Sequence, residues 1–184
     1  MLILASASPR RKELLKKVAP SFLVIPSNYD ERSLHLSASA LPLEESKMKA
    51  YEVFSRYPNE EVLSCDTVVV LRDKILGKPR DEEDAVRMLL MEQGQTQVVL
   101  SGYTYLREGK EISRTVATKV HFNPLSEAQV REYVSTKKPL DKAGAYGIQD
   151  GFPLVSYIEG SYDNVMGLPT EDLILHVKPF LRRG

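Results

Sequence analysis

Apolar positions along the chain follow two periods, which predict strands and helices in alternation. Residues 2–5 form a continuous apolar run typical of a buried strand, and residues 9–18 carry apolar side chains at helical spacing. Ser8 precedes the second segment as a natural N-cap, and Pro9 occupies its first position. Further strands are predicted at residues 22–27, 61–76, 97–108 and 111–124 and at the start of 153–169, and further helices at 43–56, 81–91, 126–136 and 170–181.

Polar residues and glycines interrupt this pattern and decide the class of fold. The apolar run at 61–76 is predicted to break near Asp66 and Thr67, with a hairpin at 72–74. The next two predicted strands alternate apolar and polar residues, as antiparallel neighbours do, while 139–151 holds too many glycines for a helix and predicts a structured loop. Together these features predict a mixed β-sheet with flanking helices, an α/β fold with two lobes around a central cleft.

Length and composition are those of an ordinary soluble globular protein. The 184 residues suit one domain or two small lobes, with 42% hydrophobic and 27% charged residues. Lys plus Arg and Asp plus Glu number 25 each, and this zero net charge argues against a general nucleic-acid binder. Cys65 is the only cysteine and the three histidines are scattered, which excludes a disulfide framework and a cysteine-rich zinc site. Without a signal-peptide pattern or an apolar run near ~18 residues, the sequence predicts a cytoplasmic protein that binds no membrane.

The start of the first predicted helix carries two arginines, Arg10 and Arg11, directly after Ser8. The helix dipole disfavours cations there by up to about 1 kcal/mol. Either these side chains point into solvent, or an anion binds at this turn, where backbone N–H groups and guanidinium groups both suit a phosphate. Neither a GxxxxGK[ST] nor a GxGxxG phosphate-binding pattern is present.

Carboxylates are candidates for chemistry in two places. Asp66 and Thr67 interrupt a strongly apolar strand, where an unpaired carboxylate is costly and a metal ion or a lysine would relieve the cost. The alternative is a carboxylate at a sheet edge that caps a turn. Glu31 follows another predicted strand; alone it is a solvated turn residue, but paired with Asp66 it forms an oxygen site suited to Mg²⁺.

Cations and a glycine-rich segment complete the candidates. Lys78 lies on a short Gly-Lys-Pro turn, and Lys49 adds a second cation, although a surface lysine on a helix is the commoner case. In residues 141–149 the glycines permit close approach of the backbone to a ligand. Lys142 supplies a polar group there, and Gln149 can donate and accept as reading a base edge requires. A plain connecting loop is the alternative.

Taken in order, these segments resemble the Maf family of nucleoside-triphosphate pyrophosphatases, relatives by fold of the inosine-triphosphatase group. The resemblance covers essentially the whole chain, as a single Maf-like domain over 1–184. The segments that carry it are LASASPRRKELL at 4–15, DE at 30–31, KA at 49–50, DTVV at 66–69, GKP at 77–79, LDKAGAYGIQ at 140–149 and IEGSYDNVMGLP at 158–169. The chain departs from the family pattern at LSGYTYLREGK, residues 100–110, where a histidine and a Thr-Gly step are expected.

The resemblance implies hydrolysis of a nucleoside triphosphate between its α and β phosphates with a divalent cation, Mg²⁺ or alternatively Mn²⁺, in a homodimer. The Asp-Thr step and the glutamine that ends the glycine segment place the chain with the branch that acts on dTTP and UTP. By this resemblance Arg10, Thr67 and Gln149 govern substrate choice, and Asp66 is the proton acceptor. The alternatives are a family member with another base specificity, such as 7-methyl-GTP, or a nucleotide-binding regulator of septum formation without turnover.

These observations combine into one hypothesis about the site. The predicted catalytic residues are Asp66, Glu31, Lys78 and Lys49, of which Glu31 and Asp66 hold the metal. The predicted residues that bind or select the substrate are Ser8, Arg10, Arg11, Thr67, Gln149 and Lys142. A triphosphate carries about four negative charges, so a set of cations around a carboxylate pair suits its binding and hydrolysis.

Overall fold

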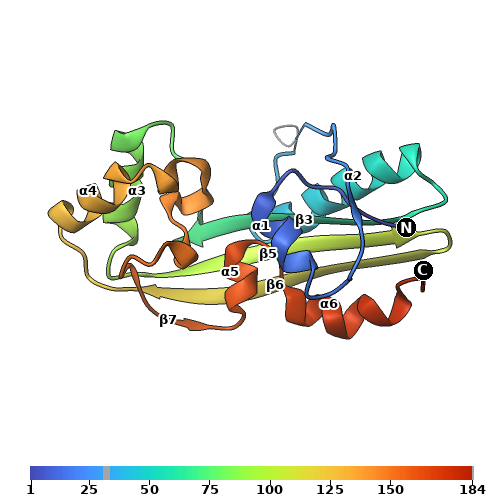
Figure 1. Cartoon of the computed structure of the whole chain (residues 1–184). Coiled ribbons are helices and arrows are strands. Elements are labelled where there is room, and N and C mark those ends of the chain that lie inside the picture. The colour runs from blue at the N-terminus through green and yellow to red at the C-terminus, as the bar shows by residue number, and fades with distance from the viewer. Residues whose placement is uncertain (31–33, 184) are drawn as a thin grey trace. The chain divides into compact units, whose positions relative to one another are not determined.

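The computed structural model describes residues 1–30 and 34–183 and confirms a mixed sheet flanked by helices (Figure 1). The strands are β1 Leu2–Leu4, β2 Leu23–Val24, β3 Glu61–Leu71, β4 Lys74–Leu76, β5 Thr96–Arg107, β6 Lys110–Phe122 and β7 Val155–Glu159. The α-helices are α1 Pro9–Leu15, α2 Leu41–Arg56, α3 Glu82–Glu92, α4 Glu127–Ser135, α5 Tyr162–Met166 and α6 Thr170–His176. Short 3₁₀ turns are η2 Lys138–Asp141, η3 Ala143–Ala145, η4 Ile148–Asp150 and η5 Lys178–Phe180.

Parallel and antiparallel pairs occur in the same sheet, whose order is β2-β1-β3-β5-β6-β7 with β4 added on β3. Strand β1 pairs in parallel with β2 and with β3, whereas β4 and β7 are antiparallel to β3 and β6. None of the helices in the described part of the chain is long and apolar enough to span a membrane.

Most predicted elements are confirmed, and the exceptions lie at β2 and in the middle of β3. The hairpin after β3 turns at Arg72 and Asp73, both with positive φ, as a two-residue hairpin turn requires. The strand predicted at 22–27 is reduced to the two residues of β2. The predicted break near Asp66 and Thr67 is wrong, because β3 continues without interruption and both polar side chains find partners from other elements. The glycine-rich loop is built from the turns η2, η3 and η4.

The chain divides into two compact units. The first unit comprises Met1–Thr67, Leu100–Val116 and Gly167–Gly184, and the second comprises Val68–Val99 and Ala117–Met166. Strands β3, β5 and β6 therefore contribute residues to both units.

A small apolar core in the first unit joins α2 to the strands. The apolar face of α2 packs Ala50 and Val53 against strand residues, with Phe54 partly buried beside them. The strand residues of this core are Ile3, Val62 and Leu106. Gly102 lies where the backbone of β5 meets the start of α2, since a Cβ at this position would be 2.3 Å from the backbone nitrogen of Leu43.

The second unit has the larger core, and a carboxylic acid lies within it. Helices α3 and α4 pack against each other, and side chains from both join strand residues in one apolar cluster. The Glu92 side chain, at the end of α3, is fully buried, and its Oε1 accepts a hydrogen bond of 2.8 Å from Nε2 of Gln97. Burial raises the pKa of Glu92 well above its ordinary value, and the bond from Gln97 opposes this only in part.

We expect Gly102→Ala to destabilise the protein strongly. The added methyl group meets backbone atoms of Leu43 at 2.3–2.4 Å, so β5 or α2 has to shift, which costs about 2 kcal/mol or more. Gly77→Ala is the matched control, because a Cβ at Gly77 has no atom within 4 Å. Urea denaturation measures the free energy of unfolding of both variants; equal losses would contradict this account of Gly102.

We expect the burial of Glu92 to make the stability of the protein depend on pH. The unfolded chain releases the Glu92 proton near pH ~4.3, whereas the folded chain retains it to higher pH. The free energy of unfolding therefore falls as pH rises above that value, by at most about 1.4 kcal/mol per pH unit, until the folded-state carboxyl ionises. Glu92→Gln removes this contribution, so the variant gains stability relative to the parent as the pH rises from about 5.

Urea denaturation across this pH range tests the expectation. Glu82→Gln, at the exposed start of the same helix, is the control that loses a carboxyl without a buried environment. Parallel stability curves for the parent and Glu92→Gln would rule out a buried protonated acid.

Candidate active site

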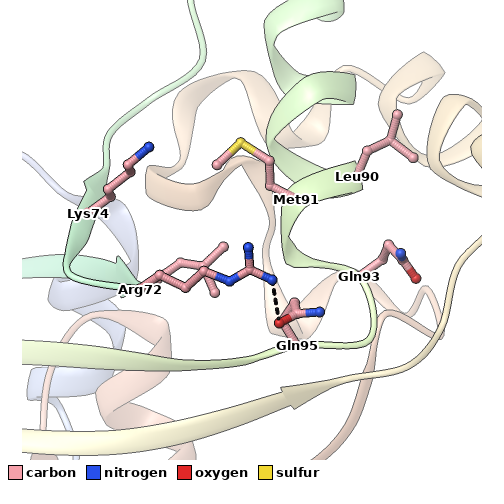
Figure 2. A pocket seen from close by; sticks show the side chains of 7 residues that line it. Arg72, Lys74, Leu90, Met91, Gln93 and Gln95 are labelled. Atoms are coloured by element: carbon pink, nitrogen blue, oxygen red, sulfur yellow. Dashed lines mark hydrogen bonds between the residues drawn. The ribbon is translucent and has the colours of Figure 1, made fainter.

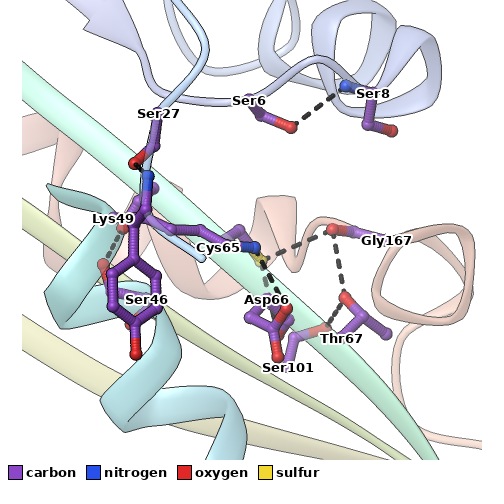
Figure 3. Close-up of polar contacts among 12 residues, drawn as sticks. Ser6, Ser8, Ser27, Ser46, Lys49, Cys65, Asp66, Thr67, Ser101 and Gly167 are labelled. Carbon is purple, nitrogen blue, oxygen red and sulfur yellow. Dashed lines mark hydrogen bonds and ion pairs between the residues drawn. The ribbon is translucent and has the colours of Figure 1, made fainter. Parts of the chain in front are cut away.

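The turn between β1 and α1 is organised by serine hydroxyl groups. The Ser8 side chain caps α1 by accepting a hydrogen bond of 3.3 Å from the backbone nitrogen of Arg11, and Pro9 opens the helix as predicted. The backbone nitrogen of Ser8 in turn donates to Oγ of Ser6, which is buried (Figure 3). Arg10 follows in the same first turn and is partly exposed.

Arg11 does not simply extend into solvent from the helix start. Its Nε donates to the carbonyl oxygen of Gly167 at 2.8 Å, and its Nη2 donates to Oγ1 of Thr67 at 3.1 Å. The planar guanidinium group suits such a double contact, because its N–H groups diverge at fixed angles. Arg11 is therefore held by the protein itself, which the sequence alone left open.

The Thr67 hydroxyl is surrounded by protein partners. Besides Arg11, its Oγ1 lies 2.8 Å from Oγ of Ser101 and 3.4 Å from the Gly167 carbonyl oxygen (Figure 3). A hydroxyl has one proton and two lone pairs, and these three partners match that capacity. The Gly167 carbonyl oxygen also accepts a 3.4 Å contact from Sγ of Cys65. Burial raises the pKa of Cys65, so this thiol is a buried filler and not a reactive nucleophile.

Asp66 forms an ion pair with Lys49. The Nζ of Lys49, on α2, lies 3.1 Å from Oδ1 of Asp66, on β3, and the two side chains are only 9% and 13% exposed (Figure 3). The ammonium group offsets the cost of removing the carboxylate from water. Lys49 is thus not a solvated surface lysine, and Asp66 is not a carboxylate that caps a turn at the sheet edge.

Neighbouring residues of β3 face different partners. Successive side chains of a strand project to opposite faces of the sheet. Ser64 and Asp66 contact residues of α2, whereas Cys65 and Thr67 contact the carbonyl oxygen of Gly167. The Asp66 carboxylate and the hydroxyl of the next residue, Thr67, therefore project to opposite faces of the sheet.

Three further predicted site residues, Lys78, Lys142 and Gln149, lie in the second unit. Lys78 is exposed on its turn, and the carbonyl oxygen of the preceding Gly77 accepts a hydrogen bond of 3.1 Å from the backbone of Gly144. Gln149 is exposed in η4. The Lys142 side chain is only 11% exposed, and its Nζ donates to the carbonyl oxygen of Lys138 at 2.6 Å.

Lys142 belongs to a polar network that shapes the glycine-rich loop. Its Nζ lies 3.7 Å from Oδ2 of Asp150, and the same carboxylate oxygen accepts a 2.7 Å hydrogen bond from the hydroxyl of Tyr133. That hydroxyl accepts a 2.8 Å bond from the backbone nitrogen of Gly147. Burial, reinforced by the Asp150 carboxylate, raises the pKa of Tyr133, so its hydroxyl stays protonated as the donor. The structure thus gives Lys142 contacts within the loop.

Candidate metal ligands are few in the described structure. Among residues 1–30 and 34–183, no three His, Cys, Asp or Glu side chains come together as a metal site. Glu31, the predicted second ligand, lies outside the described residues. Mg²⁺ bound with a triphosphate usually takes one or two carboxylates together with phosphate oxygens and water. The Asp66 carboxylate, a hard oxygen donor, fits this kind of binding.

A separate hollow on the second unit contains none of the predicted site residues (Figure 2). Its lining includes the side chain of Arg72, which donates a 2.9 Å hydrogen bond to Oε1 of Gln95. The other lining residues are Leu71, Lys74, Leu90, Met91 and Gln93.

Sequence reasoning missed Ser101 and Gly167, which complete the surroundings of Thr67. Ser101 lies in the segment where the chain departs from the family pattern, and the departure itself was the only signal. Gly167 stands in the VMGLP stretch, which by itself reads as a turn and a helix start. Its function is carried by a backbone carbonyl, for which residue type gives no signal.

Comparison with known proteins gives matches over nearly the whole chain. A family model described as Maf-like protein matches residues 1–180. The dTTP/UTP pyrophosphatase of Thermococcus onnurineus is 44% identical over 172 residues, which are 93% of this chain and 93% of the relative. The protein of the same name from Pyrococcus abyssi is 42% identical over 179 residues, 97% of this chain and 95% of the relative. Among solved structures, the Ham1 protein of Staphylococcus aureus aligns with a TM-score of 0.46 and 13% identity, over 66% of this chain and 71% of that protein.

We expect Arg11→Lys to lower the stability of the protein by about 1–2 kcal/mol, because one ammonium group cannot reach both the Gly167 carbonyl and the Thr67 hydroxyl in the geometry of a guanidinium. Urea denaturation measures the loss. Arg183→Lys, at an exposed position near the C-terminal end, is the matched control. If both variants unfold at the same urea concentration as the parent, the contacts of Arg11 contribute nothing to stability.

Proposed function

Since the chain belongs to the Maf family, we propose that it hydrolyses dTTP and UTP to the nucleoside monophosphate and pyrophosphate. The relatives that bear this activity in their names are 42–44% identical over more than nine-tenths of the chain. The structural observation that carries the proposal is the Lys49–Asp66 pair, a partly buried carboxylate held next to a cation on strand β3.

Asp66 has the role of proton acceptor in this proposal. Water attacks the α-phosphorus, a new P–O bond forms, and the bond from the α-phosphorus to the oxygen shared with the β-phosphate breaks. The attacking water gives its proton to a carboxylate oxygen of Asp66, and pyrophosphate leaves with the bridging oxygen. Lys49 keeps the carboxylate paired and oriented until it takes the proton.

Positive charge offsets the charge of the substrate. Hydrolysis of a triphosphate depends on positioning and on neutralising the charge that develops on the leaving pyrophosphate. At the helix start, Ser8 positions the first turn of α1, and the guanidinium group of Arg10 in that turn is proposed as a phosphate contact. Lys78, exposed on its short turn, is proposed as a further phosphate contact.

A divalent cation, Mg²⁺ or Mn²⁺, is part of the proposal. Asp66, with Glu31 as the second ligand expected from the sequence, would hold it. When bound, the cation neutralises phosphate charge and lowers the pKa of a coordinated water.

Substrate choice is proposed to depend on Arg10, Thr67 and Gln149. Uracil and thymine each present two carbonyl acceptors on either side of an N–H donor, and the Gln149 amide can both donate and accept. The hydroxyl of Thr67 is engaged by Arg11 and Ser101, so we propose that Thr67 acts on substrate choice by positioning Arg11. We also propose that the protein works as a homodimer in the cytoplasm.

Release of pyrophosphate from a panel of triphosphates tests the activity. The panel contains dTTP, UTP, CTP, the purine triphosphates and 7-methyl-GTP, each with Mg²⁺, with Mn²⁺ and with a chelator. Fastest turnover of dTTP and UTP with a divalent cation is the expected result. A preference for 7-methyl-GTP would replace the proposed substrate, and binding of a nucleotide without release would replace an enzyme with a regulator.

We expect Asp66→Asn to lower kcat by at least about 100-fold, because the amide keeps the size of the side chain but cannot take a proton from water. Asp73→Asn is the matched control, since Asp73 lies exposed in the hairpin after the same strand, with a positive φ that asparagine tolerates. Pyrophosphate release is measured on both variants after circular dichroism shows them folded. Turnover by Asp66→Asn equal to that of Asp73→Asn would refute the role of Asp66.

A further inference from the structure

A chain of three buried polar side chains crosses the core of the second unit and ends on the glycine-rich loop. The hydroxyl of Tyr146 donates to Oε1 of Gln97 at 2.8 Å, and Nε2 of Gln97 donates to Oε1 of Glu92 at 2.8 Å. All three side chains lie in the interior, with Glu92 fully buried and Gln97 and Tyr146 at most 5% exposed. Each bond in the chain has a definite direction, from the loop toward helix α3.

The surroundings of Glu92 favour its neutral form. Its Oε2 is buried and has no hydrogen-bond partner among the described residues. Burial raises the pKa of Glu92 well above its ordinary value and so favours the neutral, protonated acid. The titratable groups near it are the phenols of Tyr146 and Tyr133, whose pKa values are raised first by burial and further by the Glu92 carboxyl group.

The loop backbone also packs directly on the carboxyl group. A Cβ at Gly144 would lie 2.9 Å from Oε1 of Glu92 and 3.3 Å from the methyl groups of Val69, and Gly144 has a φ of +73°. Only glycine fits this position without strain, because a Cβ has no room between the loop backbone and Glu92. On its other side the loop is held by Tyr133, whose hydroxyl contacts both Gly147 and Asp150.

Gln149 lies between these anchors and is itself exposed. Tyr146 precedes it by three positions, and Asp150 follows it directly. Hydrogen bonds weaken steeply when their angles depart from linearity, so an amide reads a base edge only if its backbone is held in place. The loop therefore needs fixed contacts on both sides of Gln149.

We propose that the buried chain Glu92–Gln97–Tyr146 is a positioning element that holds residues 143–150 in the conformation in which Gln149 distinguishes uracil and thymine from other bases. This inference rests on the proposed function and deepens it, because it adds three residues that determine specificity from the interior of the second unit. The three are positioning residues, since they act through the loop and do not reach the reacting phosphates.

The proposal predicts that these residues affect the choice between bases and not the rate of hydrolysis. Loosening the loop weakens the contacts to the base, while the groups proposed to act on the α-phosphate remain on the first unit. The discrimination between UTP and CTP should therefore fall with kcat for UTP nearly unchanged. Cytosine is a suitable competitor, because its amino group and ring nitrogen reverse two of the three positions that uracil presents.

The experiment compares the ratio of kcat/KM for UTP to that for CTP across variants of the full chain. A ratio does not depend on the fraction of folded enzyme, so a merely destabilised variant leaves it unchanged. Gln149→Ala removes the amide itself and is expected to lower this ratio by about tenfold. Tyr146→Phe is expected to lower the ratio by about fivefold. Tyr157→Phe, at a tyrosine 54% exposed in β7, is the matched control and should keep the parent ratio.

Two variants of the acid separate hydrogen bonding from packing. Glu92→Gln keeps an acceptor for Gln97 and should retain the selectivity, whereas Glu92→Leu keeps the bulk, removes the acceptor and should lose it. If Glu92→Leu fails to fold, Tyr146→Phe still tests the positioning role. Amide hydrogen exchange at Gly147 and Gln149 gives a readout without substrate, and faster exchange in Tyr146→Phe than in Tyr157→Phe is expected.

The outcomes are distinguishable. A parent protein that releases no pyrophosphate from any triphosphate overturns the proposed function, and the selectivity inference with it. A parent that prefers UTP, with Tyr146→Phe showing the same ratio as Tyr157→Phe, overturns the positioning role alone. Unchanged amide exchange in Tyr146→Phe would overturn it as well.

Discussion

The ion pair between Lys49 and Asp66 is the interaction on which the centre of the first unit depends. Asp66 lies within the continuous strand β3, directly after five buried residues, and a carboxylate there without a partner would cost several kcal/mol. The lysine comes from α2, which is itself held against the strands by an apolar face. Packing of the helix therefore places the cation, and the cation allows the strand to carry a carboxylate.

Much of the fold follows from local patterns in the sequence. The Ser8 cap, the hairpin at Arg72–Asp73 and the helix caps at Asp81 and Ser126 are local, and each depends on a few adjacent residues. The break expected in β3 was wrong for a related reason: the pattern shows that Asp66 is polar but not that a lysine 17 positions earlier pairs with it.

The candidate site was predictable only as a set of residues. Its hydrogen bonds join residues that are far apart in the sequence, such as Thr67 with Ser101 and Arg11 with Gly167. Lys142 shows the same limit, because its type suggested a ligand contact and its neighbours place it inside the loop. Nothing in the sequence indicates that Glu92 is buried, since a glutamate at the end of an amphipathic helix is usually solvated.

The hydrogen bond from Arg11 to Gly167 joins positions 156 residues apart. During synthesis on a ribosome the helix that bears Arg11 emerges 156 residues before its acceptor. The surroundings of Thr67 are thus completed only after Gly167 has left the exit tunnel. A nascent or prematurely terminated chain would contain Asp66 and Lys49 yet lack the carbonyl that orders their neighbours.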